Sequence, residues 1–193
     1  MDGSRICLMI ALVALIALSA IFSSTETAYS SVNMIRLKQM AKSGNKKAKT
    51  AYTISKNFTA VITTILIGNN VVNILATSLA TALLTDIFGT SGVALATAVM
   101  TILILVFGEI APKIVAKAKA ESFVLLVAKP LSVMVTIFRP ISFVVESLEG
   151  HWEKKMDIEN VTATEDELLE IVSTIEQEGV LEQEERELIE SVI

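Results

Sequence analysis

Three long apolar stretches constrain the fold of this chain more than any other feature of its sequence. They cover about residues 6–29, 58–84 and 93–113. As helices, all three are long enough to cross a hydrocarbon layer of about 30 Å. The composition agrees, because 52% of the 193 residues are hydrophobic and only 19% are charged. The sequence therefore predicts an all-α membrane protein with three transmembrane helices, and it excludes a soluble enzyme.

Basic residues between the apolar stretches predict the orientation. Seven lie between the first two stretches, and Lys113, Lys117 and Lys119 lie at the end of the third, whereas residues 85–92 contain no basic residue. Because short loops rich in lysine and arginine stay in the cytoplasm, the N-terminus is expected outside and the C-terminus inside. We expect a multi-pass protein of the inner (plasma) membrane.

Residues 121–148 allow two interpretations. Hydropathy alone would make them a fourth crossing, but Lys129-Pro130 and Arg139-Pro140 divide them into short apolar runs. Charges near the bilayer centre and prolines within helices are both costly. We therefore predict bent amphipathic helices that form a juxtamembrane belt on the cytoplasmic face. Residues 1–150 would form the transmembrane domain, and residues 151–193, with 14 acidic and 3 basic residues, a cytosolic acidic helical bundle.

Polar residues inside the apolar stretches are the candidates for function, because they are expensive in lipid. In the first stretch Ser19, Ser23 and Glu26 share one helical face. In the second, three asparagines (Asn69, Asn70 and Asn73) follow Gly68. A single serine or asparagine is often only a packing contact between helices, but clusters of this kind favour a functional site.

The third stretch contains Gly108-Glu109-Ile110-Ala111-Pro112-Lys113. Pro112 has no N–H, so the carbonyl of Gly108 loses its usual helical partner beside the Glu109 carboxylate. Irregular backbone of this kind is tolerated in membranes where it lines an ion site. The alternative is a simple kink with Glu109 reaching the interface. Counted along the helices, the three clusters lie at similar depths and are expected to converge.

The ligand class follows from the atoms available. Hydroxyl, amide, carbonyl and carboxylate oxygens suit hard cations such as Mg²⁺, Ca²⁺ or Na⁺. Zinc is not expected, because the sequence has one cysteine and one histidine, and that histidine (His151) lies outside the apolar stretches.

The three strings resemble the transmembrane domain of the CorC/CNNM family of magnesium transporters over essentially the whole chain. The resemblance implies a homodimer that exports Mg²⁺ in exchange for Na⁺, and an acidic bundle that leads into cytosolic CBS domains absent from this chain. It places the metal site on Ser19, Ser23, Asn69, Asn70, Asn73, Gly108 (through its carbonyl) and Glu109, and it leaves open which asparagine coordinates. Glu26 is a candidate for the coupling Na⁺ or for charge compensation.

Two functional hypotheses remain at this point. The first is a secondary-active Mg²⁺ transporter, and the second is a membrane-anchored metal sensor without net transport. An intramembrane hydrolase is not expected, since the sequence offers no HExxH helix and no catalytic aspartate pair. The lipid bilayer and a second copy of the chain are the expected partners, and no nucleic acid is expected.

Overall fold

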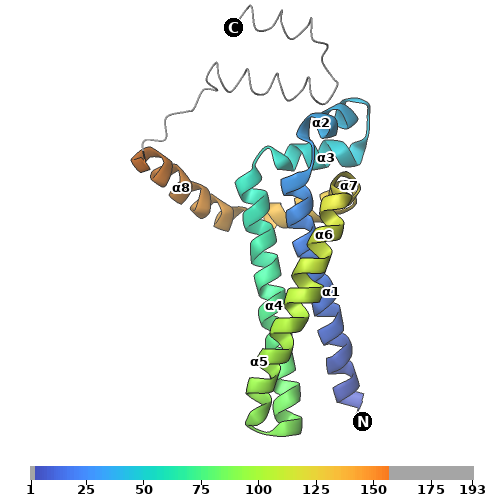
Figure 1. Cartoon of the computed structure of the whole chain (residues 1–193). Coiled ribbons are helices and arrows are strands. Elements are labelled where there is room, and N and C mark those ends of the chain that lie inside the picture. The colour runs from blue at the N-terminus through green and yellow to red at the C-terminus, as the bar shows by residue number, and fades with distance from the viewer. Residues whose placement is uncertain (1–2, 157–193) are drawn as a thin grey trace, which may run out of the picture. The chain divides into compact units, whose positions relative to one another are not determined.

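The computed structural model describes residues 3–156, and all the elements in this range are helical (Figure 1). The chain divides into two units, Met1–Leu148 and Glu149–Ile193. From residue 157 onward, the predicted acidic helical bundle lies outside the described residues.

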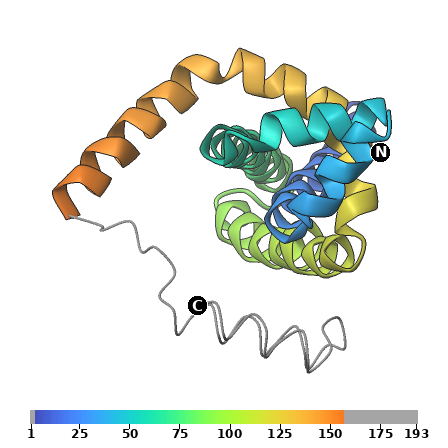
Figure 2. The ribbon, with the colours of Figure 1, turned by 90° about the horizontal axis from the view of Figure 1, so that it is seen from above.

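The three predicted apolar stretches each lie in a long helical segment. The first is α1 (Gly3–Ser31) and the second is α4 (Phe58–Phe88). The third is a continuous rod made of α5 (Ser91–Leu103), the π-helix η1 (Ile104–Ile110) and α6 (Ala111–Ala118). These segments run side by side, with α4 antiparallel to the other two (Figures 1 and 2). The first and third segments exceed the expected spans at both ends, whereas α4 begins at Phe58 as expected and extends beyond the expected end only, to Phe88.

The turn between α4 and α5 is tight. Gly89 adopts a φ of 64°, a left-handed conformation that favours glycine. A Cβ atom on Gly92 would lie 2.3 Å from the carbonyl oxygen of Leu84, so the two helices approach too closely for any side chain there. At this end of the molecule Arg5 forms an ion pair of 2.8 Å with Asp86, which links the start of α1 to the hairpin.

The helix α7 (Ala120–Ile137) differs from the predicted pattern. It continues through Pro130, where we expected a break, and it ends just before the second predicted break at Arg139-Pro140, where α8 (Arg139–Met156) begins. Val124, Ala128 and Leu131 are buried. Their packing explains why one missing backbone hydrogen bond does not end the helix.

Length and composition make α7 a fourth candidate for crossing a membrane, after α1, α4 and the α5–α6 rod. Its direction differs from theirs. Figure 2, which looks along the long helices, shows α7 lying across their ends. This is the arrangement expected of a helix at the membrane surface.

The main core lies at the end of the bundle where α1 ends. Here α2 (Met34–Lys42) and α3 (Lys46–Ser55) form a helical hairpin, with N-termini capped by the side chains of Asn33 and Asn45. Leu37 and Ala51 from this hairpin are buried together with residues of α1, α4 and α7. Elsewhere the long helices expose large aliphatic side chains, as expected for surfaces that face lipid.

Candidate ion site

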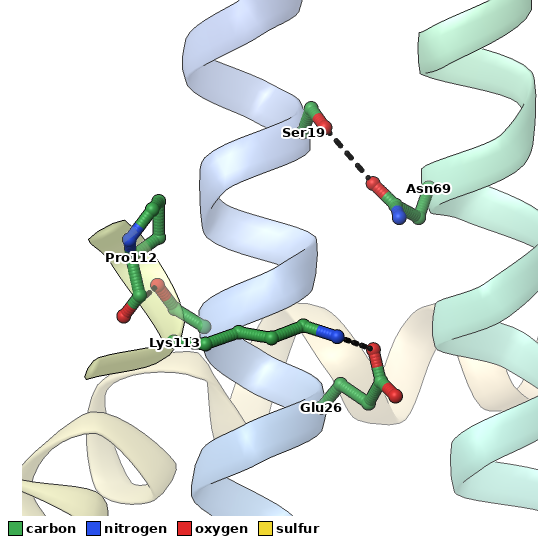
Figure 3. Close-up of polar contacts among 6 residues, drawn as sticks. Ser19, Glu26, Asn69, Pro112 and Lys113 are labelled. Carbon is green, nitrogen blue, oxygen red and sulfur yellow. Dashed lines mark hydrogen bonds and ion pairs between the residues drawn. The ribbon is translucent and has the colours of Figure 1, made fainter. Parts of the chain in front are cut away.

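The centre of the bundle contains a buried polar contact between α1 and α4. The Ser19 hydroxyl donates a hydrogen bond of 3.1 Å to Oδ1 of Asn69 (Figure 3). Ser19 is 1% exposed and Asn69 is 9% exposed. Two of the predicted site residues, from helices that are separate in the sequence, are thus directly bonded.

The third helix meets this contact at Gly108. A Cβ atom at that position would lie 2.9 Å from Oγ of Ser19, so the backbone of η1 approaches the hydroxyl closely. A second close approach lies about one turn nearer to α2 and α3, where Gly68 packs against the ring of Phe22. A Cβ atom on Gly68 would lie 2.5 Å from Cε1 of that ring. The two glycines allow α1 to lie close to both neighbours, and this brings Ser19, Asn69 and Gly108 together.

Two further oxygens of the predicted set are buried and have no hydrogen-bond partner among the residues that the structure describes. They are Oγ of Ser23 and Oδ1 of Asn73. Ser23 lies one turn after Ser19, and Asn73 lies one turn after Asn69. Most buried polar atoms in proteins have a partner, so these two oxygens are candidates for contact with a ligand that donates a hydrogen bond or is positively charged.

The two oxygens lie on opposite sides of the Ser19–Asn69 contact. Because α1 and α4 are antiparallel, Ser23 is displaced along the bundle by about 6 Å in one direction and Asn73 by about 6 Å in the other. The main chains at Ser23 and Asn73 are therefore offset by about 12 Å along the bundle, and both side chains lean toward the Ser19–Asn69 contact because helical side chains tilt toward the N-terminus.

The segment around Gly108 is a π-helix and not the broken helix that Pro112 led us to expect. The N–H of Ala111 donates to the carbonyl of Val106, five residues earlier. Pro112 follows immediately and has no N–H to offer to the carbonyl of Gly108. Single π-turns often occur at functional sites because the wider turn changes which residues face the neighbouring helices.

Glu109 is partly buried and lines a recess of about 290 Å³. Thr77 of α4 and Thr97 and Thr101 of α5 line the same recess, which we call the threonine recess. Thr77 lies one turn beyond Asn73 and donates to its carbonyl oxygen. Glu109 thus shares this recess with Thr77, which lies one turn from Asn73.

The remaining candidates lie apart from the Ser19–Asn69 contact. Asn70 is exposed on the outer face of α4. Glu26 forms an ion pair of 3.3 Å with Lys113 of α6 (Figure 3). Nearby, Ser24 donates a hydrogen bond to the carbonyl of Pro112. These contacts fasten α1 to α6 on the side of the site where α1 ends.

Within residues 3–149, no group of three or more histidine, cysteine, aspartate or glutamate side chains could hold a metal ion. A cation here would be held mainly by neutral oxygens, with Glu109 as the nearby carboxylate. This donor set suits a weakly held hard cation and does not suit a permanently bound transition metal.

The model of the cyclin M transmembrane N-terminal domain matches residues 10–185 of the chain. The chain belongs to this family. The predicted resemblance to CorC/CNNM proteins is therefore confirmed, and the protein is a membrane domain of that class.

Relatives of this cyclin M domain occur in bacteria and plants. A chloroplastic DUF21 domain-containing protein of Arabidopsis thaliana is 36% identical over 94% of this chain, and a UPF0053 protein of Haemophilus influenzae is 36% identical over 86%. The UPF0053 inner membrane protein YfjD of Escherichia coli is 43% identical over 54% of the chain. The matches cover 28%, 40% and 24% of these relatives, so the chain spans less than half the length of each.

Sequence reasoning about this cyclin M domain missed three kinds of contact. The threonines of the recess were not singled out, although Thr97 and Thr101 are four residues apart in an apolar stretch. Lys113 was noted as a topological signal and as the end of the Gly108–Lys113 string, but not as the partner of Glu26. The packing of Phe22 on Gly68 had no sequence signal, because an aromatic residue in an apolar stretch is ordinary.

Proposed function

We propose that this domain carries Mg²⁺ across the membrane along the oxygens between α1, α4 and η1. The observation that supports this most strongly is the pair of buried, unpartnered oxygens, Oγ of Ser23 and Oδ1 of Asn73, on either side of the Ser19–Asn69 hydrogen bond.

The cost of those two atoms is the first supporting argument. A buried polar atom without a partner costs about 1–3 kcal/mol. A passing cation would satisfy both atoms in turn, and hydroxyl and amide oxygens are ligands that Mg²⁺ accepts. An ion that contacts these two atoms would remove this cost. This would explain why a transport pathway contains buried polar atoms without a protein partner.

The axial spacing indicates how the ion would move. Because Ser23 and Asn73 are offset along the bundle, the ion would exchange ligands stepwise, first on one side of Ser19 and Asn69 and then on the other. Mg²⁺ gives up its water reluctantly and usually keeps several water ligands. Glu109 would offset part of the charge on the Asn73 side, beside the threonine recess.

The proposed placement in the membrane follows from charge and direction. The α1 and α4 helices and the α5–α6 rod would cross, with the N-terminus outside, because the basic residues gather at the opposite end. The α7 helix, which lies across the ends of the long helices, would form the cytoplasmic belt. We place the protein in the inner membrane, by analogy with the relative described as an inner membrane protein.

Export driven by Na⁺ entry and assembly as a homodimer complete the proposal. Both rest on the family resemblance. Glu26 supports a Na⁺ site less well than expected, because its carboxylate is paired with Lys113.

The decisive experiment measures Mg²⁺ flux in liposomes that contain the purified chain, with a trapped fluorescent Mg²⁺ indicator. Ser23→Ala and Glu109→Ala are expected to abolish flux, while Asn70→Ala, which alters the exposed neighbour, is expected to retain it. Monodisperse elution of all three proteins shows that they are folded.

Normal flux from both site variants would refute the proposed pathway. Mg²⁺ binding by calorimetry with zero flux in the unaltered chain would instead favour a metal sensor. If the Mg²⁺ flux did not respond to an opposing Na⁺ gradient, the proposed Na⁺ coupling would be refuted, but the proposed Mg²⁺ pathway would not.

A further inference from the structure

A second cavity lies far from the candidate ion site, where α1 turns into α2 and where α6 meets α7. Its volume is about 390 Å³. Polar and charged residues dominate its lining: Asn33, Arg36, Lys117, Lys119, Glu121 and Ser122. We call it the basic cavity.

The charges in the basic cavity are not balanced. Arg36 forms an ion pair of 3.1 Å with Glu121. Within the part of the chain that the structure describes, Lys117 and Lys119 form no ion pair. Three cationic side chains and one carboxylate leave a net charge of +2 in a concave site. Such a site attracts anions, since its walls concentrate the field of the like charges.

The backbone brings the two lysines together. Residues two apart on a regular helix do not share a face. Here the helix is interrupted at Lys119, which has φ −129° and ψ 35°, and both lysines line the same cavity. The interruption also starts α7 without a side-chain cap, so its first N–H groups add partial positive charge.

The position of the basic cavity indicates which class of anion it binds. It lies at the end of α1 and of the α5–α6 rod, where these segments leave the proposed membrane, and α7 crosses the same level. Charge predicts that this is the cytoplasmic face, where anionic phospholipids create a negative surface potential. Basic pockets between membrane helices at this level bind phospholipid head groups.

We propose that the basic cavity binds the phosphate head group of an anionic phospholipid, with Lys117 and Lys119 as the main contacts. A head group held there would connect the α1–α2 turn to the α6–α7 junction. It would thus stabilise the end of the bundle without entering the Ser19–Asn69 site. This inference depends on the proposed orientation but not on Mg²⁺ transport.

The test measures thermal unfolding of the full chain in detergent micelles with added phosphatidylglycerol. At about ten times the Kd of the lipid, we expect the midpoint to rise by about 3–6 °C. Lys117→Gln combined with Lys119→Gln is expected to lose most of that rise. The matched control is Lys46→Gln with Lys47→Gln, which removes the same charge from exposed lysines of α3 outside the cavity and is expected to retain it.

Three comparisons identify the source of binding. Phosphatidylcholine tests the need for negative charge, and inorganic phosphate at the same phosphate concentration tests the need for a lipid. A variant with arginine at both positions, K117R/K119R, is expected to keep the rise because it keeps the charge. Should the double glutamine variant fail to fold, Lys117→Gln and Lys119→Gln tested singly are each expected to lose part of the rise.

If phosphatidylglycerol stabilised the glutamine and control variants equally, the proposal would be overturned, because general surface charge would then explain the stabilisation. Equal stabilisation by phosphatidylcholine would exclude charge recognition, and equal stabilisation by inorganic phosphate would identify a soluble anion as the ligand. Loss of Mg²⁺ flux in Ser23→Ala with an unchanged lipid response would show that the two sites are independent.

Discussion

The Ser19 hydroxyl donates a hydrogen bond of 3.1 Å to Asn69 across 50 positions of sequence, at a point where both residues are buried. This bond joins α1 to α4 inside an otherwise aliphatic bundle, and Gly108 of η1 lies against its donor. It divides the proposed pathway into a Ser23 side and an Asn73 side. The consequences of changing it can be measured in both stability and transport.

Asn69 and Asn70 form a matched pair for the first prediction. Asn69→Ala leaves the Ser19 hydroxyl without its acceptor, and we expect the free energy of unfolding to fall by about 0.6–2 kcal/mol. Mg²⁺ flux should also be lost. Asn70→Ala removes the same amide from the exposed face and should change stability by less than about 0.5 kcal/mol. Unfolding in mixed micelles and flux in liposomes check both values, and identical behaviour of the two variants would contradict the structure.

Gly68 provides the second prediction. A Cβ atom there would lie 2.5 Å from the Phe22 ring, so Gly68→Ala must displace the ring or separate α1 from α4. Overpacking of this kind costs about 1–3 kcal/mol. Combining Gly68→Ala with Phe22→Leu shortens the opposing side chain and should recover part of the loss. A double variant less stable than the sum of the two single changes would show that the contact is not the cause.

The Glu26–Lys113 ion pair gives the third prediction. Their side chains are 29% and 38% exposed, so a double-mutant cycle should give a coupling below about 1 kcal/mol. If Glu26 serves only to balance Lys113, the Glu26→Gln, Lys113→Gln double variant transports Mg²⁺ with an unchanged Na⁺ response. We expect this outcome. A Na⁺ response that disappears both in Glu26→Gln alone and in the double variant would assign the carboxylate to the coupling ion.

The sequence predicted the helices and the polar clusters for clear physical reasons. Apolar stretches long enough to cross a membrane form helices because backbone groups in lipid must bond within the chain. Ser19 and Asn69 stood out because polar side chains are costly there. The meeting of these two residues with Gly108 followed from similar depth, and the structure places all three in contact or close approach.

The details that could not be predicted depend on rotation about the helix axes. Asn69 and Asn70 differ by about 100° around α4, and the sequence does not say which one faces α1. The π-turn at η1 alters the faces of the third helix, so the direction of Glu109 could not be read from periodicity. Pro130 was expected to interrupt a helix, but the burial of its neighbours on α7 depends on tertiary packing.

The fourth prediction concerns Pro112 and the π-helix before it. Because Pro112 has no N–H, it cannot complete an α-helical bond to the carbonyl of Gly108. Pro112→Ala supplies this donor and favours an α-helix through η1, which would stabilise the rod by up to about 3 kcal/mol. The change from a π-turn to an α-turn shifts the register of the preceding residues and turns Gly108 away from Ser19.

We therefore expect Pro112→Ala to unfold at a higher temperature and yet to transport Mg²⁺ more slowly than the unaltered chain. Pro140→Ala is the control, because Pro140 lies at the start of α8 and outside the long helices. It should leave flux unchanged. The two measurements separate the explanations: a destabilised Pro112→Ala variant would mean that the proline supports the helix, whereas full flux in a stabilised variant would mean that the π-turn has no part in transport.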